Sequence, residues 1–93
     1  MIPLLSKPRL ATKAKLRLDH ITNQYVLLAP EKGLALNRTG SAISQLCTGA
    51  HTVEAIIEEL CSSHPSAERA LIEAEVLAFL QTLLDRGLIE VKA

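Results

Sequence analysis

YVLLAPEKGLALN, residues 25–37, is the stretch of sequence that decides the fold. Its apolar residues fall in two short runs, and Pro30 and Gly33 frame a tight turn between those runs. Glu31 and Lys32 stand at the tip of this turn. The pattern predicts two antiparallel strands, of which the second is short and leads directly into a helix.

The residues before this stretch predict a third strand. KLRLDHI, residues 15–21, alternates apolar and polar side chains, which is typical of a half-exposed strand. Residues 22–24 form a turn between it and the strand at 25–29. With the strand at 34–36, these segments predict an antiparallel three-stranded meander over residues 15–37.

After the meander the apolar spacing changes to the helical period. The spacing predicts three helices, near residues 39–47, 53–62 and 66–86. The residues predicted to cap or end them are Asn37 or Thr39, Gly49, Thr52, Ser66 and Gly87. Residues 88–92, LIEVK, are either a short strand or a tail. The predicted fold class is α+β, a winged helix-turn-helix-like domain with a three-stranded antiparallel sheet followed by three helices.

The third predicted helix carries more apolar surface than one core requires. Its apolar residues cover an arc of about 160°, whereas about 100° suffices to face a single core. They are Ile72, Val76, Leu77, Phe79, Leu80, Leu83 and Leu84. Either the helix is central and contacts both the sheet and the other helices, or one flank of it lines a groove. The two explanations are compatible if the groove lies where the helix and the sheet edge meet.

Length and composition fit one small domain. With 93 residues the chain builds a single small core, and 48 % of its residues are hydrophobic. Tyr25 and Phe79 are its only aromatic residues, which is poor material for stacking single-stranded nucleic acid. Residues 1–14 hold two prolines and three cations without a clear period. We therefore expect a flexible basic N-terminal arm, followed by a single domain at residues 15–93.

The zero net charge conceals an asymmetry between the two halves of the chain. Residues 1–51 hold seven Lys or Arg against two acids, whereas residues 52–93 hold eight acids against three Lys or Arg. This is either ordinary solvated surface or a polar molecule with a basic arm and an acidic helical face. The basic arm and an unprotected sheet edge favour a homodimer, in which the arm or the first strand packs on a second copy.

The sequence shows neither a secretory signal nor a membrane span. Its first residues, MIPLL, are too short for a signal-peptide core, and no apolar run approaches the ~20 residues that a membrane span needs. Cys47 and Cys61 have no CxxC spacing and fall on apolar helical stripes, so we expect buried, reduced thiols. The expected compartment is the cytoplasm.

No catalytic or metal-binding constellation is present in the sequence, so we expect neither an enzyme nor a bound cofactor. The histidines at positions 20, 51 and 64 are scattered, and none has the spacing typical of metal ligands. The four glycines are far apart and form no phosphate-binding loop. The serines and cysteines lack a neighbouring base at a recognisable spacing.

Two functions fit a helix-turn-helix domain with a small sheet, namely binding DNA and binding a peptide. DNA affinity depends on cations that neutralise phosphates, but the helix at 66–86 carries four acids against two arginines. The strand at 34–36 pairs with a neighbour on one side only, and no Pro or Lys protects LALN, residues 34–37. An extended chain can therefore add to this edge by β-augmentation. A DNA-binding winged helix and a dimerisation module stay as alternatives.

Four longer stretches are characteristic in combination. They are PRLATKAKLRLD (8–19), YVLLAPEKGLALNRTGSAI (25–43), LCTGAHTVEAIIEEL (46–60) and EVLAFLQTLLDRGLIE (75–90), and they cover nearly the whole chain. In them the chain resembles the coenzyme PQQ synthesis protein D (PqqD) family. Two positions depart from the family pattern, which often has Asp where Thr48 stands and Asp where Glu75 stands. The second change keeps the charge on a longer side chain.

The resemblance implies a non-catalytic chaperone for a precursor peptide. It implies that the chain binds the ribosomal precursor peptide PqqA and presents it to the radical SAM enzyme PqqE, which crosslinks a Glu and a Tyr of that peptide during pyrroloquinoline quinone biosynthesis. The family's groove lies between the third strand and the third helix, where the open edge and the wide apolar arc also point. The expected binding residues are Leu34, Ala35, Leu36, Asn37, Glu75, Phe79 and Thr82, the last three at the rim.

Overall fold

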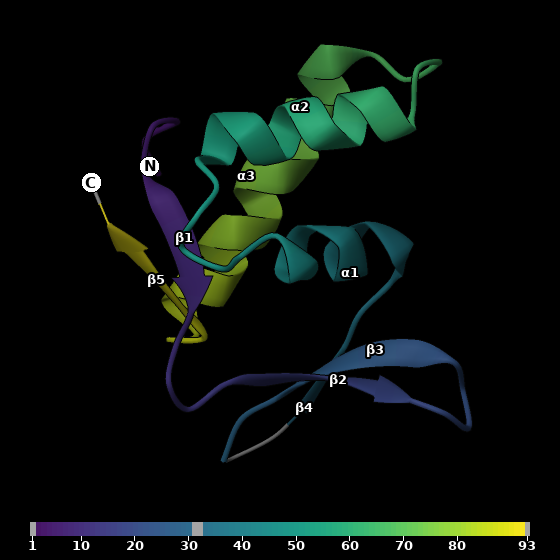
Figure 1. The fold of residues 1–93 in the computed structure, drawn as a ribbon, viewed down its shortest axis with the longest axis vertical. Helices are drawn as coiled ribbons and strands as arrows, with labels where there is room; N and C mark the ends of the chain where they lie inside the picture. The colour runs from purple at the N-terminus through teal and green to yellow at the C-terminus, as the bar shows by residue number, and fades with distance from the viewer. Residues whose placement is uncertain (1, 31–32, 93) are drawn as a thin grey trace.

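The computed structural model describes residues 2–30 and 33–92 and has an α+β fold, as predicted. In chain order its elements are β1 (Lys7–Leu10), β2 (Lys15–Asp19), β3 (Gln24–Leu28), β4 (Gly33–Ala35), α1 (Arg38–Gln45), α2 (Val53–Ser63), α3 (Arg69–Asp85) and β5 (Ile89–Lys92). Figure 1 shows the sheet β2–β3–β4 at one end of the molecule, with α1 between that sheet and α2. A second sheet pairs β1 with β5 and brings the two ends of the chain to the same side.

The predicted three-stranded meander is confirmed. β3 is the central strand and pairs antiparallel with β2 and with β4. The register places Leu16 and Leu34 opposite Leu27 from its two sides, so these three side chains share one face of the sheet. That face is the inner one, since Leu27 is fully buried. Glu31 and Lys32, predicted at the tip of the turn before β4, lie outside the described residues.

Helices α1 and α2 begin where the sequence predicts. The side chain of Asn37 accepts a hydrogen bond from the N–H of Gly40 at 2.7 Å, and the side chain of Thr52 accepts one from the N–H of Ala55 at 3.0 Å. Each bond satisfies a backbone donor that the first turn of a helix leaves without a partner. The abrupt change from strand to helix after β4 therefore has a local cause in the side chain of Asn37.

Two predicted helix ends need correction. Ser66 does not start the third helix, because residues 65–67 form a turn first and α3 begins at Arg69 without a side-chain cap. Gly49 is left-handed as predicted, with a φ of 85°, but α1 ends before it. The N–H of Gly49 instead donates to the carbonyl oxygen of Pro8 at 3.0 Å, so this residue joins the loop after α1 to β1.

Gly87 ends α3 as predicted. Its φ of 70° is a conformation that L side chains rarely adopt. The N–H of Gly87 donates to the oxygen of Leu84 at 3.0 Å, and the N–H of Leu88 donates to the oxygen of Leu83 at 2.8 Å. This pair of bonds is a Schellman motif. The chain turns sharply here and enters β5, so the C-terminal residues form the short strand rather than a tail.

The prediction of a flexible N-terminal arm is wrong for residues 7–10, which form β1. β1 pairs antiparallel with β5, and next to this pairing the N–H of Ala11 donates to the oxygen of Leu88 at 2.8 Å. Bonded and non-bonded pairs alternate along such a ladder, so Pro8, opposite Val91, stands where no N–H is needed. The sequence alone does not predict this strand, because its partner strand β5 lies at the far end of the chain.

The N-terminal segment also fills part of the core. Its buried residues are Ile2, Ser6, Pro8, Ala11 and Ala14. Arg9 faces outward, and its guanidinium forms an ion pair with the Glu90 carboxylate at 3.0 Å. Small and apolar side chains therefore point inward while a charged one points to solvent, and the folded domain includes residues that were expected to precede it.

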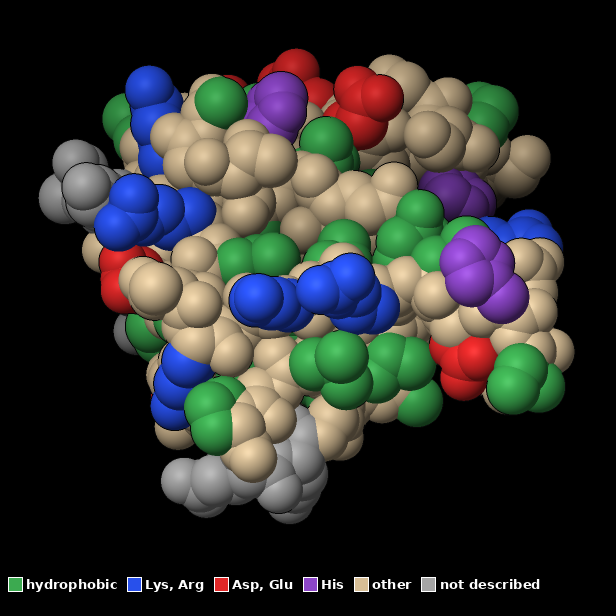
Figure 2. Space-filling view, turned by 60° about the horizontal axis from the view of Figure 1, so that its bottom comes forward, with side chains coloured by type: hydrophobic (Ala, Val, Ile, Leu, Met, Phe, Trp, Pro, Cys, Tyr) green, Lys and Arg blue, Asp and Glu red, His purple; other side chains and the backbone are tan. Residues whose placement is uncertain are grey.

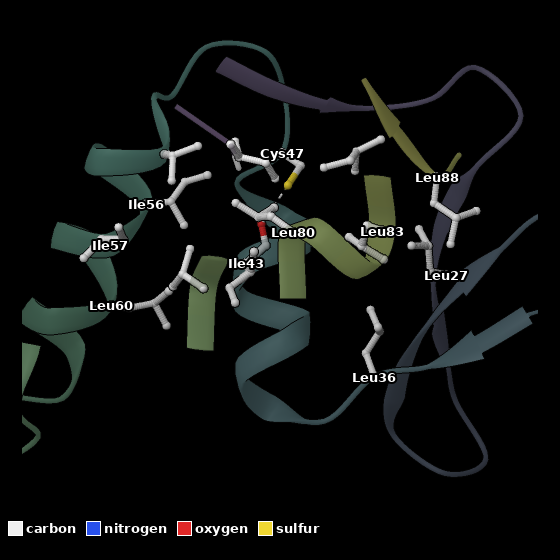
Figure 3. Packing of buried hydrophobic residues seen from close by; sticks show 14 of the residues in the cluster. Leu27, Leu36, Ile43, Cys47, Ile56, Ile57, Leu60, Leu80, Leu83 and Leu88 are labelled. Atoms are coloured by element: carbon white, nitrogen blue, oxygen red, sulfur yellow. Dashed lines mark hydrogen bonds between the residues drawn. The ribbon is translucent and has the colours of Figure 1, made fainter. Parts of the chain in front are cut away.

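Helix α3 is the centre of the core. Its Val76, Leu80 and Leu83 are fully buried. Figure 3 shows Leu80 and Leu83 between the buried side chains of α2 on one side and Leu27 and Leu36 of the sheet region on the other. This confirms that the wide apolar arc of α3 contacts both the sheet and the other helices. Part of the arc stays accessible, since its remaining members are half-buried or exposed: Ile72, Leu77, Phe79 and Leu84.

The two cysteines are free, and they differ in burial. Cys47 is 3 % exposed, and its thiol donates a hydrogen bond to the oxygen of Ile43 at 3.3 Å. Burial raises the pKa of the Cys47 thiol to about 12, because the core does not solvate a charged thiolate. Cys61 is only half-buried, on α2.

Replacing Ile2 by Ala tests the position of the N-terminal segment. We expect the free energy of unfolding to fall by about 2 kcal/mol, because the change removes buried methyl groups and leaves a cavity. Leu5→Ala is the matched control, since Leu5 is 74 % exposed. It should change the free energy by less than ~0.5 kcal/mol. Urea unfolding followed by circular dichroism measures both. Equally small effects would mean that the segment is a mobile arm after all.

Thiol labelling tests the burial of Cys47. At pH 8 iodoacetamide should alkylate Cys61 roughly ten times faster than Cys47 or more, because the thiolate is the reactive form and the raised pKa of Cys47 keeps that form scarce. Mass spectrometry of peptic fragments over time gives the two rates, and a Cys47→Ser variant identifies the Cys61 signal. Equal rates in the folded protein would contradict the packing described above.

Candidate functional site

Strand β4 leaves one side of the three-stranded sheet open. The N–H of Leu36 donates to the oxygen of Tyr25 at 3.0 Å, so the backbone groups of Leu34 and Leu36 face β3. Ala35 stands opposite Val26 at the alternate position, and its N–H and C=O point away from β3. The open edge therefore presents one backbone donor and one backbone acceptor at an exposed alanine.

One stripe of α3 runs from a contact with α1 to the start of β4. Glu75, Phe79, Thr82 and Arg86 are three or four residues apart, so they share one face of the helix. At one end, a Cβ added to Gly40 would lie 3.1 Å from the Phe79 ring. At the other end, Arg86 shares a hollow with the first residues of β4. This stripe therefore meets α1 at Phe79 and the start of β4 at Arg86, with Thr82 between the two contacts.

The seven residues predicted from the sequence lie at different depths. Leu36 is buried, Leu34 and Phe79 are half-buried, and Ala35, Asn37, Glu75 and Thr82 are exposed. Figure 3 shows Leu36 pointing toward Leu83 of α3, so the floor between the strand and the helix is apolar. Glu75 lies one helical turn before Phe79 on α3, farther along the helix from Arg86 than Phe79 and Thr82 are.

Two of the seven already use polar groups inside the chain. The side chain of Asn37 caps α1, and the backbone carbonyl oxygen of Asn37 accepts the N–H of Ser41 at 2.9 Å. The Thr82 hydroxyl donates to the oxygen of Ala78 at 3.0 Å. The open edge therefore ends at Asn37, and the Thr82 hydroxyl retains only its capacity to accept.

A hollow of about 500 Å³ opens at the Gly33 end of β4. It is lined by Lys13, Ala29, Pro30, Gly33, Leu34, Arg86 and Leu88, and we call it the Lys13–Arg86 hollow. Of these residues, only Leu34 is predicted from the sequence as a site residue. The RGL sequence after α3 is a signal that could have pointed to Arg86 and Leu88. Lys13 carries no such signal, because the pairing of β1 with β5 brings it here.

A second hollow, of about 470 Å³, lies at the other end of β4, between the β2–β3 hairpin and α1. Its lining is mainly polar and consists of Asn23, Gln24, Tyr25, Leu36, Asn37, Arg38, Ser41, Ala42 and Gln45. The open edge of β4 therefore runs between an apolar hollow with two cations and a hollow lined by amides and hydroxyls.

The outer face of the sheet is a further exposed surface. The register places Arg17 beside Val26, Val26 beside Ala35, and Lys15 beside Leu28, which is 43 % exposed. Figure 2 shows the molecule with this end turned forward, where Lys and Arg side chains lie next to hydrophobic ones. Two of the cations in the basic half of the chain therefore lie on an ordered sheet, on the face away from the core.

The described part of the chain holds neither a cluster of metal ligands nor a helix fit to cross a membrane. Within residues 2–30 and 33–92, no three His, Cys, Asp or Glu side chains gather closely enough to hold a metal ion. None of the helices in these two ranges combines the length and the apolar character that crossing a membrane requires.

Two relatives are similar in sequence to this chain over most of its length. The "PqqA binding protein" of Rhodopseudomonas palustris (strain BisB5) is 45 % identical over 82 residues, which cover 88 % of this chain and 79 % of that protein. The "PqqA binding protein" of Stutzerimonas stutzeri (strain A1501) is 31 % identical over 91 residues, 98 % of this chain and 97 % of that one. The chain therefore spans most of the length of these relatives.

Two solved structures share the fold. The PqqD part of Methylobacterium extorquens PqqCD, described as a functional, stand-alone RiPP recognition element, has a TM-score of 0.75 and 36 % identity, covering 89 % of this chain and 87 % of that one. TbiB1 in complex with the TbiA(beta) leader peptide has a TM-score of 0.76 and 25 % identity, covering 91 % and 98 %. The family described as coenzyme PQQ synthesis protein D matches residues 24–89. This chain belongs to the PqqD family.

Proposed function

We propose that this chain binds the ribosomal precursor peptide PqqA by strand addition to the open edge of β4. The relatives described above carry the name PqqA binding protein, and a structure with the same fold is a complex with a leader peptide. Leader-peptide binding by this fold needs an extended chain to find backbone partners, and β-augmentation supplies them. The chain then acts as a peptide-binding adaptor without catalytic chemistry of its own.

The observation that carries the proposal is the position of Ala35. Its N–H and C=O have no partner in β3, its side chain is exposed, and the hollow at the Gly33 end of its strand is shared with Arg86 at the end of α3. An added strand bonds to these two groups, while the half-buried Leu34 and Phe79 contact its side chains. Thr82 and Glu75 follow along the same stripe of α3 and form the rim. Backbone pairing supplies affinity here, and the flanking side chains supply selectivity.

The remaining parts of the proposal concern partners and place. The bound peptide is presented to the radical SAM enzyme PqqE, in the cytoplasm, where free cysteines such as Cys47 and Cys61 stay reduced. We further propose that the open edge of β4 supports a homodimer when no peptide is bound, since an unpaired edge favours pairing with another chain. β1 cannot serve that purpose, because it pairs with β5 on one side and meets the loop after α1 on the other.

A proline at position 35 tests strand addition. Ala35→Pro removes the outward N–H without removing a bond to β3, so the fold should persist while the affinity for synthetic PqqA falls about fivefold or more, as expected for one lost hydrogen bond. Ala35→Ser keeps the N–H and should change the affinity by less than about twofold. Isothermal titration calorimetry measures the affinities, and backbone amide NMR shifts map the contact.

Two further variants complete this test. Glu58→Ala changes an exposed residue of α2 and should leave binding unaltered. Leu36→Pro should unfold the sheet, because the N–H of Leu36 is bonded to Tyr25. If folded Ala35→Pro bound PqqA as tightly as the parent protein, or if the amide shifts lay on α2, the assignment of the groove would be wrong.

A further inference from the structure

The Lys13–Arg86 hollow combines an apolar floor with two cations. Ala29, Leu34 and Leu88 are half-buried or buried, whereas both cationic residues are exposed. Among the lining residues that the structure describes, there is no carboxylate. A site of this composition accepts a group that is apolar along its stem and negatively charged at its tip.

Both cations lie at the C-terminal end of α3, and this explains why Lys13 is held without a carboxylate partner. The Nζ atom of Lys13 lies 3.3 Å from the position that a Cβ on Gly87 would occupy, next to the last turn of the helix. The carbonyl groups at a helix C-terminus carry partial negative charge and favour a cation there. In the described part of the chain, the one ion pair joins Arg9 to Glu90, so Lys13 and Arg86 keep donors for an anion.

Three separate elements bring the two cations together. Lys13 belongs to the loop between β1 and β2, and Arg86 directly follows α3. The hydrogen bond from Ala11 to Leu88 fixes the first loop against the end of the helix. Pro30 and Gly33 supply the opposite wall at the start of β4. The hollow is therefore continuous with the open edge, about two residues or 7 Å along the strand from Ala35.

We propose that this hollow is a subsite for one acidic side chain of the bound peptide. The carboxylate pairs with Lys13 and Arg86, and the methylene stem lies on Leu34 and Leu88. The acidic residue flanks the segment that pairs with Ala35, on its Gly33 side. This subsite rests on the proposed function and deepens it. Backbone pairing along the strand does not by itself distinguish one side chain from another. A cationic hollow at one end of the strand selects an acidic residue and thereby sets the register of the peptide.

A double-mutant cycle tests the subsite. The probes are synthetic PqqA and a series of PqqA peptides in which each acidic residue in turn is replaced by its amide. The protein variants are Lys13→Gln and Arg86→Gln, with Lys15→Gln as the matched control, because Lys15 loses the same charge two positions away on the outer face of the sheet. Amide NMR spectra and thermal unfolding establish that each variant is folded.

We expect Lys13→Gln and Arg86→Gln each to weaken PqqA binding roughly five- to tenfold, and Lys15→Gln to weaken it by less than about twofold. One amide peptide should show the same loss with the parent protein and no further loss with either hollow variant. That coupling identifies the acidic residue that occupies the hollow.

Two outcomes would overturn the subsite while the proposed function stands. The first is an equal effect of Lys13→Gln and Lys15→Gln, which would indicate attraction by overall charge. The second is a series of amide peptides whose losses are identical for the parent protein and the hollow variants. Absence of PqqA binding by the folded parent protein would instead remove the proposed function, and the subsite with it.

Discussion

The burial of one face of α3 is the constraint on which the structure depends. Val76, Leu80 and Leu83 have no exposed surface, and Leu80 and Leu83 lie between α2 and the three-stranded sheet (Figure 3). Each such side chain contributes roughly 1.5–3 kcal/mol by leaving water, which is a large share of the stability of so small a domain. Because α3 is fixed by this face, its neighbouring stripe from Glu75 to Arg86 is held in place, and its members other than the half-buried Phe79 stay exposed.

The position of β4 follows from that arrangement. The strand is three residues long, and the chain leaves it at Asn37, whose side chain starts α1. Leu34 and Leu36 direct their side chains to the core and their backbone groups to β3, so the backbone groups of Ala35, like those of Gly33, face outward. An unpaired strand edge usually favours unwanted pairing with a strand of another chain. Here the edge is three residues long and ends at the helix cap Asn37, which restricts the chains that can pair with it.

The pairing of β1 with β5 links the ends of the chain to the candidate site. Gly87 turns the chain out of α3, Leu88 enters the hollow, and β5 then pairs with β1. The same pairing carries Lys13 to the end of α3. The segment that was expected to be a flexible arm therefore has a structural role, and it also contributes a cation to the surface beside β4.

The sequence by itself determined the meander, the three helices, the caps at Asn37 and Thr52 and the stop at Gly87. These features depend on residues within about four positions of one another, through alternation, helical spacing and side-chain bonds to nearby backbone groups. It also pointed to the edge of β4 and to α3, because the last strand of a three-strand meander pairs on one side only and the helix carries a wide apolar arc. Only the tertiary structure decided the pairing of β1 with β5, where Arg9 meets Glu90 across 81 positions. It likewise decided that Lys13 and Arg86 line the same hollow. Contacts between distant segments depend on which faces the packed helices leave open, and no local sequence pattern determines those faces.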